Sequence, residues 1–486
     1  MRFDGTIRRL VVVALSLAVA ASACTADDPG GPARARGPGP DDDGLAKELE
    51  EQAEKTEHRL EELEAALEAG TVGVIERVLR RRAPGWAGER LLNPAGNDWE
   101  PAIATDPSRP FVYVLHNRYG GEPACRNDCP DPAMILHVSR DGGRSWLRER
   151  YLCVCRGVRG QYDPLLEVAS NTGDVYAAWM NNFQIHVSRS ADRGRTWSTP
   201  VHVHPDVRWG DKPNMAVSPD GQDVYVQFNG PTAGDVHAAV SHDAGATWST
   251  ARITNGDRYY FDYSGAILPD GRILFSQISF DYQSPGGTAA HPIQIHVFAS
   301  DDAGESWSEQ LVDELAVGSE CVSRGCYEDY YDSGPVLAAD DDGDLVIVYN
   351  GAAEPLGPRT VYARSSTDGG RTWSERVQVS RAGVNAAYPA AVGEGDGGVR
   401  LWFMDQRGGR WNVRYRTSTD LGGSWSRPLR ISDATSGTIY KNRRGFAEVY
   451  GDYGEIAITS EGKTVAVWGE GVSYFGPGGI WFNRER

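Results

Sequence analysis

Carboxylate side chains stand at the start of six apolar stretches that recur along the chain. They belong to Glu100, Asp163, Asp211, Asp262, Asp332 and Asp452. If the fold brings them to one rim, their charges repel, raise one another's pKa, and favour a bound cation or a shared proton. Calcium is a cation that such a rim could hold, although nothing in the sequence requires a cofactor or shows a metal-ligand spacing. The alternative is structural, with each acid accepting hydrogen bonds from backbone N–H groups of a neighbouring strand.

Aromatic residues and basic residues accompany these acids. Lys212 follows Asp211, Tyr331 precedes Asp332, and Tyr450 lies two residues before Asp452. Aromatic rings stack on the apolar faces of sugars, so a rim that mixes rings with carboxylates suits a carbohydrate, whereas packing between repeats explains the rings equally well. The same loops hold the only candidates for an arginine cluster, which are Arg159, Arg208, Arg258, Arg324, Arg443 and Arg444.

The elements that must position these residues are marked by a phrase that the chain repeats six times. It reads S-x-D-x-G-x-[S/T]-W, and successive aspartates are separated by 51, 51, 59, 66 and 52 residues. Such a period indicates one supersecondary unit per repeat. We call each copy a staple, and its aspartate and tryptophan are Asp141 and Trp146, Asp192 and Trp197, Asp243 and Trp248, Asp302 and Trp307, Asp368 and Trp373, and Asp420 and Trp425.

The staple has the chemistry of a hairpin turn. Its Asp accepts hydrogen bonds from backbone N–H groups, its Gly supplies a positive φ, and its Trp packs back onto the sheet. An alternating strand lies on each side of every staple, and an apolar strand and a Gly-containing turn precede them, so each unit holds four strands. Four-stranded units with this period form the blades of a β-propeller.

Counting the inner strands predicts seven blades, the last of them without a staple. These strands begin near residues 100, 163, 211, 262, 332, 388 and 452. A further strand within 85–97 lacks a blade of its own, and we expect it to complete the last blade and close the ring. The alternative is a six-bladed propeller with a leftover hairpin.

The staple resembles the Asp-box, or BNR, repeat of the sialidase superfamily over about residues 85–486. The resemblance implies a propeller and glycan chemistry, since sialidases are retaining exo-glycosidases with an arginine triad, a Tyr nucleophile polarised by Glu, and an Asp acid/base. This chain has no F/Y-R-I-P arginine motif before its first staple, so no catalytic residue transfers by motif. The resulting hypotheses are a sialidase-like exo-glycosidase, a non-catalytic propeller that binds a glycan or a protein, and a structural scaffold.

The N-terminal region predicts export and anchoring. Residues 1–23 have the charged, apolar and small-residue parts of a signal peptide, and Cys24 ends a stretch that resembles a bacterial lipobox. We therefore expect a lipoprotein on the outer face of the cell membrane, with an ordinary cleaved signal peptide as the alternative. Residues 24–44 predict a disordered linker, 45–83 a helical stalk able to self-associate as a coiled coil, and 84–486 the propeller.

Cysteine content predicts disulfides, and the net charge limits the kinds of molecule that the protein can bind. Export favours disulfides among the six cysteines that follow Cys24. We expect the loop that holds Cys125 and Cys129 to be cross-linked to the loop that holds Cys153 and Cys155, and Cys321 to be bonded to Cys326. The net charge of −18 opposes binding to nucleic acid or to anionic lipid headgroups. We therefore expect a carbohydrate or a surface protein as partner, and contact with the membrane through the lipid anchor alone.

Overall fold

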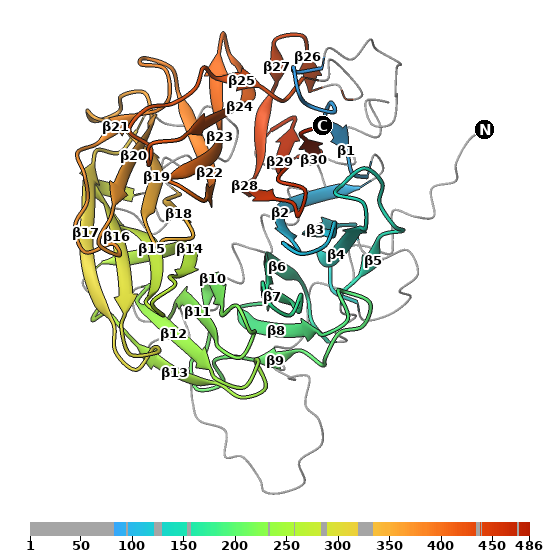
Figure 1. Cartoon of the computed structure of the whole chain (residues 1–486), viewed down its shortest axis with the longest axis vertical. Helices are drawn as coiled ribbons and strands as arrows, with labels where there is room; N and C mark the ends of the chain where they lie inside the picture. Colours follow the sequence, from blue (N-terminus) through green and yellow to red (C-terminus); the bar gives the residue numbers. More distant parts are fainter. Residues whose placement is uncertain are drawn as a thin grey trace, which may run out of the picture.

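The computed structural model describes residues 82–93, 96–120, 129–152, 157–231, 234–256, 258–282, 289–318, 334–433, 438, 440–473 and 476–486. All regular secondary structure in these ranges is β-strand. Seven antiparallel sheets follow one another around a central axis, as Figure 1 shows. The described part of the chain is therefore an all-β, seven-bladed propeller. The seven-bladed prediction is confirmed, and the six-bladed alternative is wrong.

Blades 1 to 6 are each made of strands that are consecutive in the chain. From the centre outward they are, in blade 1, β2 (Asn97–Thr105), β3 (Val112–Tyr119), β4 (Ala133–Ser139) and β5 (Arg150–Tyr151); in blade 2, β6 (Gln161–Val168), β7 (Val175–Asn181), β8 (Gln184–Ser190) and β9 (Val201–His202); in blade 3, β10 (Asp211–Val217), β11 (Val224–Asn229), β12 (Val236–Ser241) and β13 (Ser249–Arg252). They continue, in blade 4, as β14 (Tyr259–Ile267), β15 (Ile273–Tyr282), β16 (Ala289–Ser300) and β17 (Ser308–Leu315); in blade 5, as β18 (Val336–Ala339), β19 (Leu345–Gly351), β20 (Thr360–Ser366) and β21 (Val377–Gln378); in blade 6, as β22 (Ala386–Glu394), β23 (Gly398–Arg407), β24 (Arg410–Ser418) and β25 (Leu429–Arg430), with the hairpin of β26 (Lys441–Asn442) and β27 (Gly445–Phe446) beside β24.

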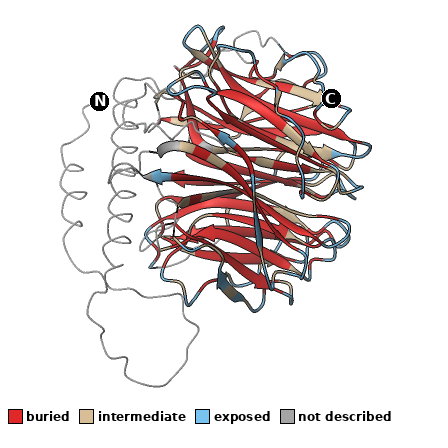
Figure 2. Ribbon diagram, turned by 90° about the vertical axis from the view of Figure 1, so that its left-hand side faces the viewer, coloured by how far each residue is buried: buried red, intermediate tan, exposed pale blue. Residues whose placement is uncertain are grey.

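Blade 7 joins the two ends of the described chain. It consists of β28 (Glu448–Ile458), β29 (Thr464–Gly471), β30 (Gly478–Arg484) and, outermost, β1 (Arg90–Leu91). In the pairing of β1 with β30, Arg90 lies opposite Phe482. Val114 of blade 1 and Val467 of blade 7 share one apolar cluster, so the first and last blades also pack face to face. Figure 2 shows the buried strands in red and the exposed residues mainly in the turns.

The staple tryptophans lie between blades. Trp197 packs against the cluster shared by blades 1 and 2, and Trp248 against that of blades 2 and 3. The same position is taken by Trp307, Trp373, Trp425 and Trp146 at four further interfaces. Among the described residues, the interface of blades 6 and 7 has no staple tryptophan and holds five others, which are Trp86, Trp402, Trp411, Trp468 and Trp481. Each staple therefore joins its own blade to the preceding one.

The turn of the first staple shows why its residue types recur. Ser145 donates to Asp141 from its backbone N, 2.8 Å to Oδ1, and from its hydroxyl, 2.6 Å to Oδ2. Ser139 Oγ accepts from Gly143 N at 2.8 Å. Gly143 has φ +80°, and a Cβ there would lie 2.5 Å from the ring of Phe482.

The other five staples repeat these bonds. Hydrogen bonds from the Ser or Thr four residues later lower the pKa of the staple carboxyls, to about 2 for Asp192, Asp243 and Asp368. These aspartates are therefore ionised and engaged in turns, and they serve the fold.

Removing one staple carboxyl should destabilise the propeller without unfolding it. In an Asp141→Ala variant, Ser145 loses both acceptors, and we expect a loss of about 1 to 2 kcal/mol, as for other side chains that cap backbone N–H groups. Urea unfolding measures this, and Asp206→Ala is the matched control because Asp206 is exposed and makes no described side-chain bond. Equal stability of the two variants would contradict the role of the staple.

Most N-terminal predictions fall outside the described residues. Residues 1–81, which include the signal peptide, Cys24, the linker and nearly all of the stalk, lie there, as do Cys125, Cys153, Cys155, Cys321 and Cys326. Cys129 is disulfide-bonded, and its partner is not among the described residues, so the pairing stays a prediction. The described residues include no helix that could span a membrane.

Candidate functional site

The inner strands begin on the face opposite the staples. Each blade's third strand runs in the same direction as its first, and the staple follows the third strand, so the first strand starts at the other end of the blade. We call this end the staple-free face. Near it, six inner strands shift register by a β-bulge, for example between Trp99 and Ala102 in β2 and between Tyr162 and Leu165 in β6.

The bulges show which residues are equivalent around the ring. Five inner strands place a residue with positive φ there, namely Glu100 (53°), Asp163 (51°), Lys212 (45°), Tyr388 (51°) and Gly451 (78°). Asp211 and Asp452 each lie one residue away from this step. Glu100 and Asp163 therefore occupy this step itself, whereas Asp211 and Asp452 lie beside it, because the bulges change the register that counting along the sequence assumes. Pro follows four of the five residues, and this X-Pro signal could have located the step.

Glu100 has the structural role that the sequence offered for these acids, which is to accept hydrogen bonds from a neighbouring strand. Its Oε2 accepts from Asn117 Nδ2 at 2.5 Å and from the backbone N of Asp163, in blade 2, at 3.1 Å. Glu100 and Asp163 are both buried. The carboxylate therefore joins the bulge of blade 1 to that of blade 2 by accepting a hydrogen bond from a backbone N–H group.

Tyr450 does not face a ligand, contrary to its prediction as a candidate. Its side chain is fully buried, its hydroxyl donates to Asn97, and its ring centre lies 3.9 Å from that of Trp99. It therefore packs blade 7 against blade 1. Of the other ligand-face candidates, Tyr331 and Asp332 lie outside the described residues, as do the side chains of Asp262 and Asp452.

Blade 1 also contains a buried ionic cluster that the sequence did not predict. Arg118 donates to both oxygens of Asp98 at 2.6 and 3.0 Å, and to both of Glu149 at the same two distances. His116 and His137 share a hydrogen bond of 3.0 Å between their Nε2 atoms, and burial lowers the pKa of each to about 3. Both rings are therefore neutral at pH 7. Every member of the cluster except the half-buried Glu149 is buried, so we assign the cluster to the fold.

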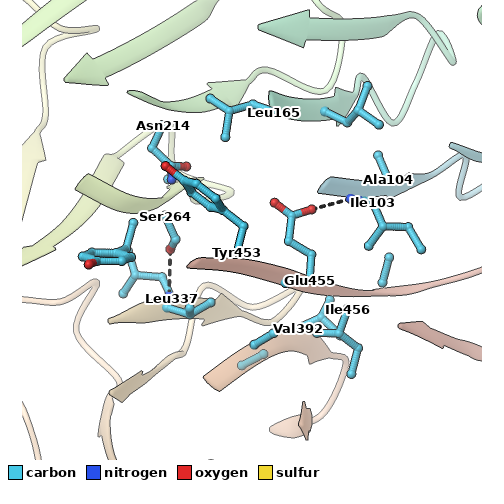
Figure 3. Close-up of a pocket in the computed structure, with 18 of the residues that line it drawn as sticks. Ile103, Ala104, Leu165, Asn214, Ser264, Leu337, Val392, Tyr453, Glu455 and Ile456 are labelled. Carbon is cyan, nitrogen blue, oxygen red and sulfur yellow. Dashed lines mark hydrogen bonds between the residues drawn. The ribbon is translucent and has the colours of Figure 1, made fainter. Parts of the chain in front are cut away.

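A cavity of about 360 Å³ lies at the axis of the propeller. All seven inner strands or the turns at their ends contribute to its lining (Figure 3). Its polar side chains are Thr105, Glu167, Asn214, Tyr263, Ser264, Tyr388, Tyr453 and Glu455, and apolar residues such as Leu165, Leu337 and Val392 fill most of the remaining wall. Among the described residues that line it there is no arginine.

Two glutamates, Glu167 and Glu455, line this cavity close enough to interact electrostatically. Glu455, labelled in Figure 3, accepts from the backbone N of Ile103 at 2.6 Å. Burial raises its pKa to about 8, the bond from Ile103 lowers it, and the nearby charge of Glu167 raises it. Burial alone raises the pKa of Glu167 to about 8. Near neutral pH the cavity therefore holds carboxylic acids that can release a proton.

Lys212 contacts Tyr453, a residue of the cavity lining. The Lys212 Nζ lies 4.7 Å from the ring centre of Tyr453, which extends from β28, and 5.9 Å from that of Phe261. Both distances are within the range of cation–π contacts. Lys212 is the one ligand-face candidate with a described contact to a side chain of the lining, and it comes from blade 3 while its partner Tyr453 comes from blade 7.

The predicted arginine candidates contribute no described side chain to the cavity lining. Arg258 donates to Ser279 Oγ at 2.7 Å and to Pro292 O at 2.7 Å, so blade 4 itself holds its guanidinium. Arg159, Arg208, Arg443 and Arg444 are exposed, and Arg324 lies outside the described residues.

The residues that form the cavity were missed by the sequence analysis. Tyr453 and Glu455 follow Asp452 by one and three residues, and Glu167 follows Asp163 by four. Tyr453 and Glu455 are two residues apart, which is the spacing of side chains on one face of a strand, but neither is in step with Asp452.

No family model matches the chain. A sialidase of Micromonospora viridifaciens is 29% identical over 133 residues, which cover 22% of this chain and 21% of that relative. The chain thus matches about a fifth of the relative's length.

Solved structures provide a further comparison. A polysaccharide lyase of family PL25, an ulvan lyase, superposes with a TM-score of 0.50 at 11% identity over 82% of this chain and 95% of its own, and its complex with -[GlcA(1-4)Rha3S]- gives a TM-score of 0.51 at 12% identity over the same shares. The Hadza microbial sialidase Hz136 gives 0.42 at 16% identity over 80% and 66%. At these identities the structures show the fold alone. The lyase structures therefore show a propeller, and the partial match in sequence makes this propeller sialidase-like.

Proposed function

We propose that this sialidase-like propeller acts on glycans, and that the axial cavity is the site where it does so. The observation that carries the proposal is the lining, which combines tyrosines from three blades with two carboxyl groups around about 360 Å³. That volume lies within the range of ligand pockets, about 300 to 1,000 Å³. Tyrosine rings offer sugars an apolar face and a hydroxyl group. The sialidase match and the lyase fold support the same substrate class.

The cavity suits the end of a glycan chain. Its lining comes from every side of the axis, so a terminal sugar can enter along the axis while an internal unit would have to cross the ring of strands. This shape supports exo-action over cleavage within a chain.

Glu455 is the residue that we propose as proton donor in a glycosidase reaction. A carboxyl group with a pKa of about 8 is protonated at neutral pH and can protonate the leaving glycosidic oxygen. Glu167 is the second carboxyl group of the pair. Because the two carboxyl groups interact, the pair releases its two protons in two separate steps. After the first step one carboxyl group is still protonated and can act as the acid, while the other is ionised and can act as the base.

The alternative function is binding of a glycan or a protein without turnover. The specific observation in its favour is the bond from Ile103 N to Glu455, which gives this carboxyl group a structural role in joining blades 7 and 1. The two functions differ in whether a bond in the ligand is broken.

A panel of fluorogenic glycosides, together with a glycan array, tests the proposal. We expect binding to a subset of glycans, fluorophore release that is maximal near pH 8, and at least a tenfold loss of turnover in Glu455→Gln because the amide cannot donate as an acid. Glu305→Gln is the matched control, since Glu305 is exposed in a staple on the opposite face. Binding without release would favour the non-catalytic alternative, and the absence of any binding would reject both.

The cellular location and the remaining partners belong to the proposal as well. The signal peptide and Cys24 support an exported lipoprotein, and the stripe of the stalk supports self-association. Calcium at the rim is also part of the proposal. The described residues contain no group of three or more His, Cys, Asp or Glu able to hold a metal ion, so no described group supports it.

A further inference from the structure

The charge of the axial cavity restricts which sugar can enter it. Its described lining contains two carboxyl groups and no lysine, arginine or histidine. A carboxylated sugar would bring a third acid into this space, whose described lining offers no cation; the Lys212 ammonium contacts the lining residue Tyr453 but is not part of the lining. Burying an unpaired charge is costly. The cavity therefore disfavours the anionic sugars that the resemblance to sialidases suggests.

Glu167 is the group in the lining that a cation would satisfy. Its carboxyl group accepts no hydrogen bond from any described residue, whereas Glu455 is held by the backbone N of Ile103. Glu167 therefore has acceptor capacity for a ligand, which a protonated amine can use through a charge-assisted hydrogen bond.

One aromatic ring of the lining already contacts an alkylammonium group. Lys212 Nζ stands over the ring of Tyr453 at 4.7 Å, and Tyr453 itself belongs to the lining. The same ring, with those of Tyr263 and Tyr388, can receive a second amine from a ligand. A metal ion is less suited to the site, because the described residues contain no group of three or more His, Cys, Asp or Glu able to hold one, and hard cations require several oxygen ligands.

We infer that the axial cavity selects a terminal amino sugar with a free, protonated amine, and that Glu167 is its counter-ion. The inference rests on the proposed function and gives its substrate class. Glu167 pairs with the ammonium group, the tyrosines contact the sugar ring, and Glu455 keeps its proton. The affinity then rises between pH 6 and 7.5, because Glu167 must ionise to form the pair.

Calorimetry with three oligosaccharides tests the inference on the folded protein. The probes are a glucosamine trimer, the N-acetylglucosamine trimer and sialyllactose. We expect the glucosamine trimer to bind about 10- to 100-fold more tightly than the acetylated trimer, the range of one hydrogen bond to a charged group. Glu167→Gln should abolish this difference and leave the acetylated trimer within about threefold of its wild-type affinity. Glu305→Gln should change neither.

Lys212→Met separates the amino sugar from an anionic one. If the ligand carries an amine, removing the Lys212 ammonium leaves its affinity unchanged or increases it, because a like charge beside Tyr453 is lost. If the ligand carries a carboxylate, the affinity falls. Tighter binding of the acetylated trimer or of sialyllactose would overturn the inference and leave the glycan function standing, whereas binding of none of the three, nor of any glycan on the array, would reject the function itself.

Discussion

A Lys441→Met variant should lose about 3 to 5 kcal/mol of unfolding free energy, the range for removing one partner from a buried ion pair. Lys441 Nζ donates to Glu89 and, at 2.8 Å, to Glu470, and all three side chains are fully buried. Trp468 Nε1 adds a bond of 2.9 Å to Glu470. Methionine preserves the volume of the lysine stem but leaves two carboxyl groups without their cation.

The charges of this cluster explain the expected size of the effect. Burial raises the pKa of Glu89 well above its ordinary value, Lys441 lowers it, and Glu470 raises it again. Without Lys441, folding requires protonation of the glutamates or the burial of like charges. Two matched variants are informative: Lys463→Met should be near wild type, since Lys463 makes no described side-chain bond, and adding Glu89→Gln to Lys441→Met should restore part of the loss.

The cluster also fastens the segment that completes blade 7. Glu89 precedes β1, and Asp433 accepts from the backbone N of Glu89 at 3.2 Å and from that of Ala83. Hydrogen exchange should therefore show the first opening of the Lys441→Met variant at residues 82–91. Unchanged urea unfolding together with unchanged exchange there would show that the ion pairs contribute nothing to the closure of the ring.

Wild-type stability should fall between pH 5 and pH 8 because of the cavity glutamates. Their folded-state pKa values of about 8 exceed the ordinary value of 4.5, so between these values the folded state holds protons that the unfolded state has released. The stability that they contribute is complete below about pH 4.5 and is lost as pH rises through about 8. Each unit of pKa difference corresponds to about 1.4 kcal/mol.

The double variant Glu167→Gln/Glu455→Gln should remove this part of the pH dependence, since an amide does not titrate. We expect its stability relative to wild type to improve by about 3 kcal/mol between pH 5 and 8. This is less than the two pKa differences alone would give, because both side chains remain partly accessible from the cavity. Urea unfolding at both pH values measures this, with Glu305→Gln as control. Parallel curves for the double variant and wild type would mean that the glutamates are ionised in the folded protein.

The location of the cavity follows from the way the inner strands satisfy their backbone groups. An inner strand is an edge, and its free N–H groups need acceptors from the next blade. Glu455 supplies one to Ile103, Glu100 to Asp163, and Ser264 Oγ to Leu337 at 2.8 Å. Glu167 lies on the same wall without such a bond, which is why it is the residue available to a ligand.

The amino-acid sequence by itself determined the blades. A staple is local chemistry, since Asp, Gly, Ser and Trp within eight residues form the turn, and the repeats predicted both the seven-bladed ring and its staple-free face. The tertiary structure alone decided the site. Bulges moved Asp211 and Asp452 out of step with Glu100, burial assigned Tyr450 to the core, and the curvature of the ring brought Glu167 and Glu455, nearly 300 residues apart, into one cavity. Such long-range positions depend on how seven sheets pack around an axis, and no short stretch of sequence encodes that packing.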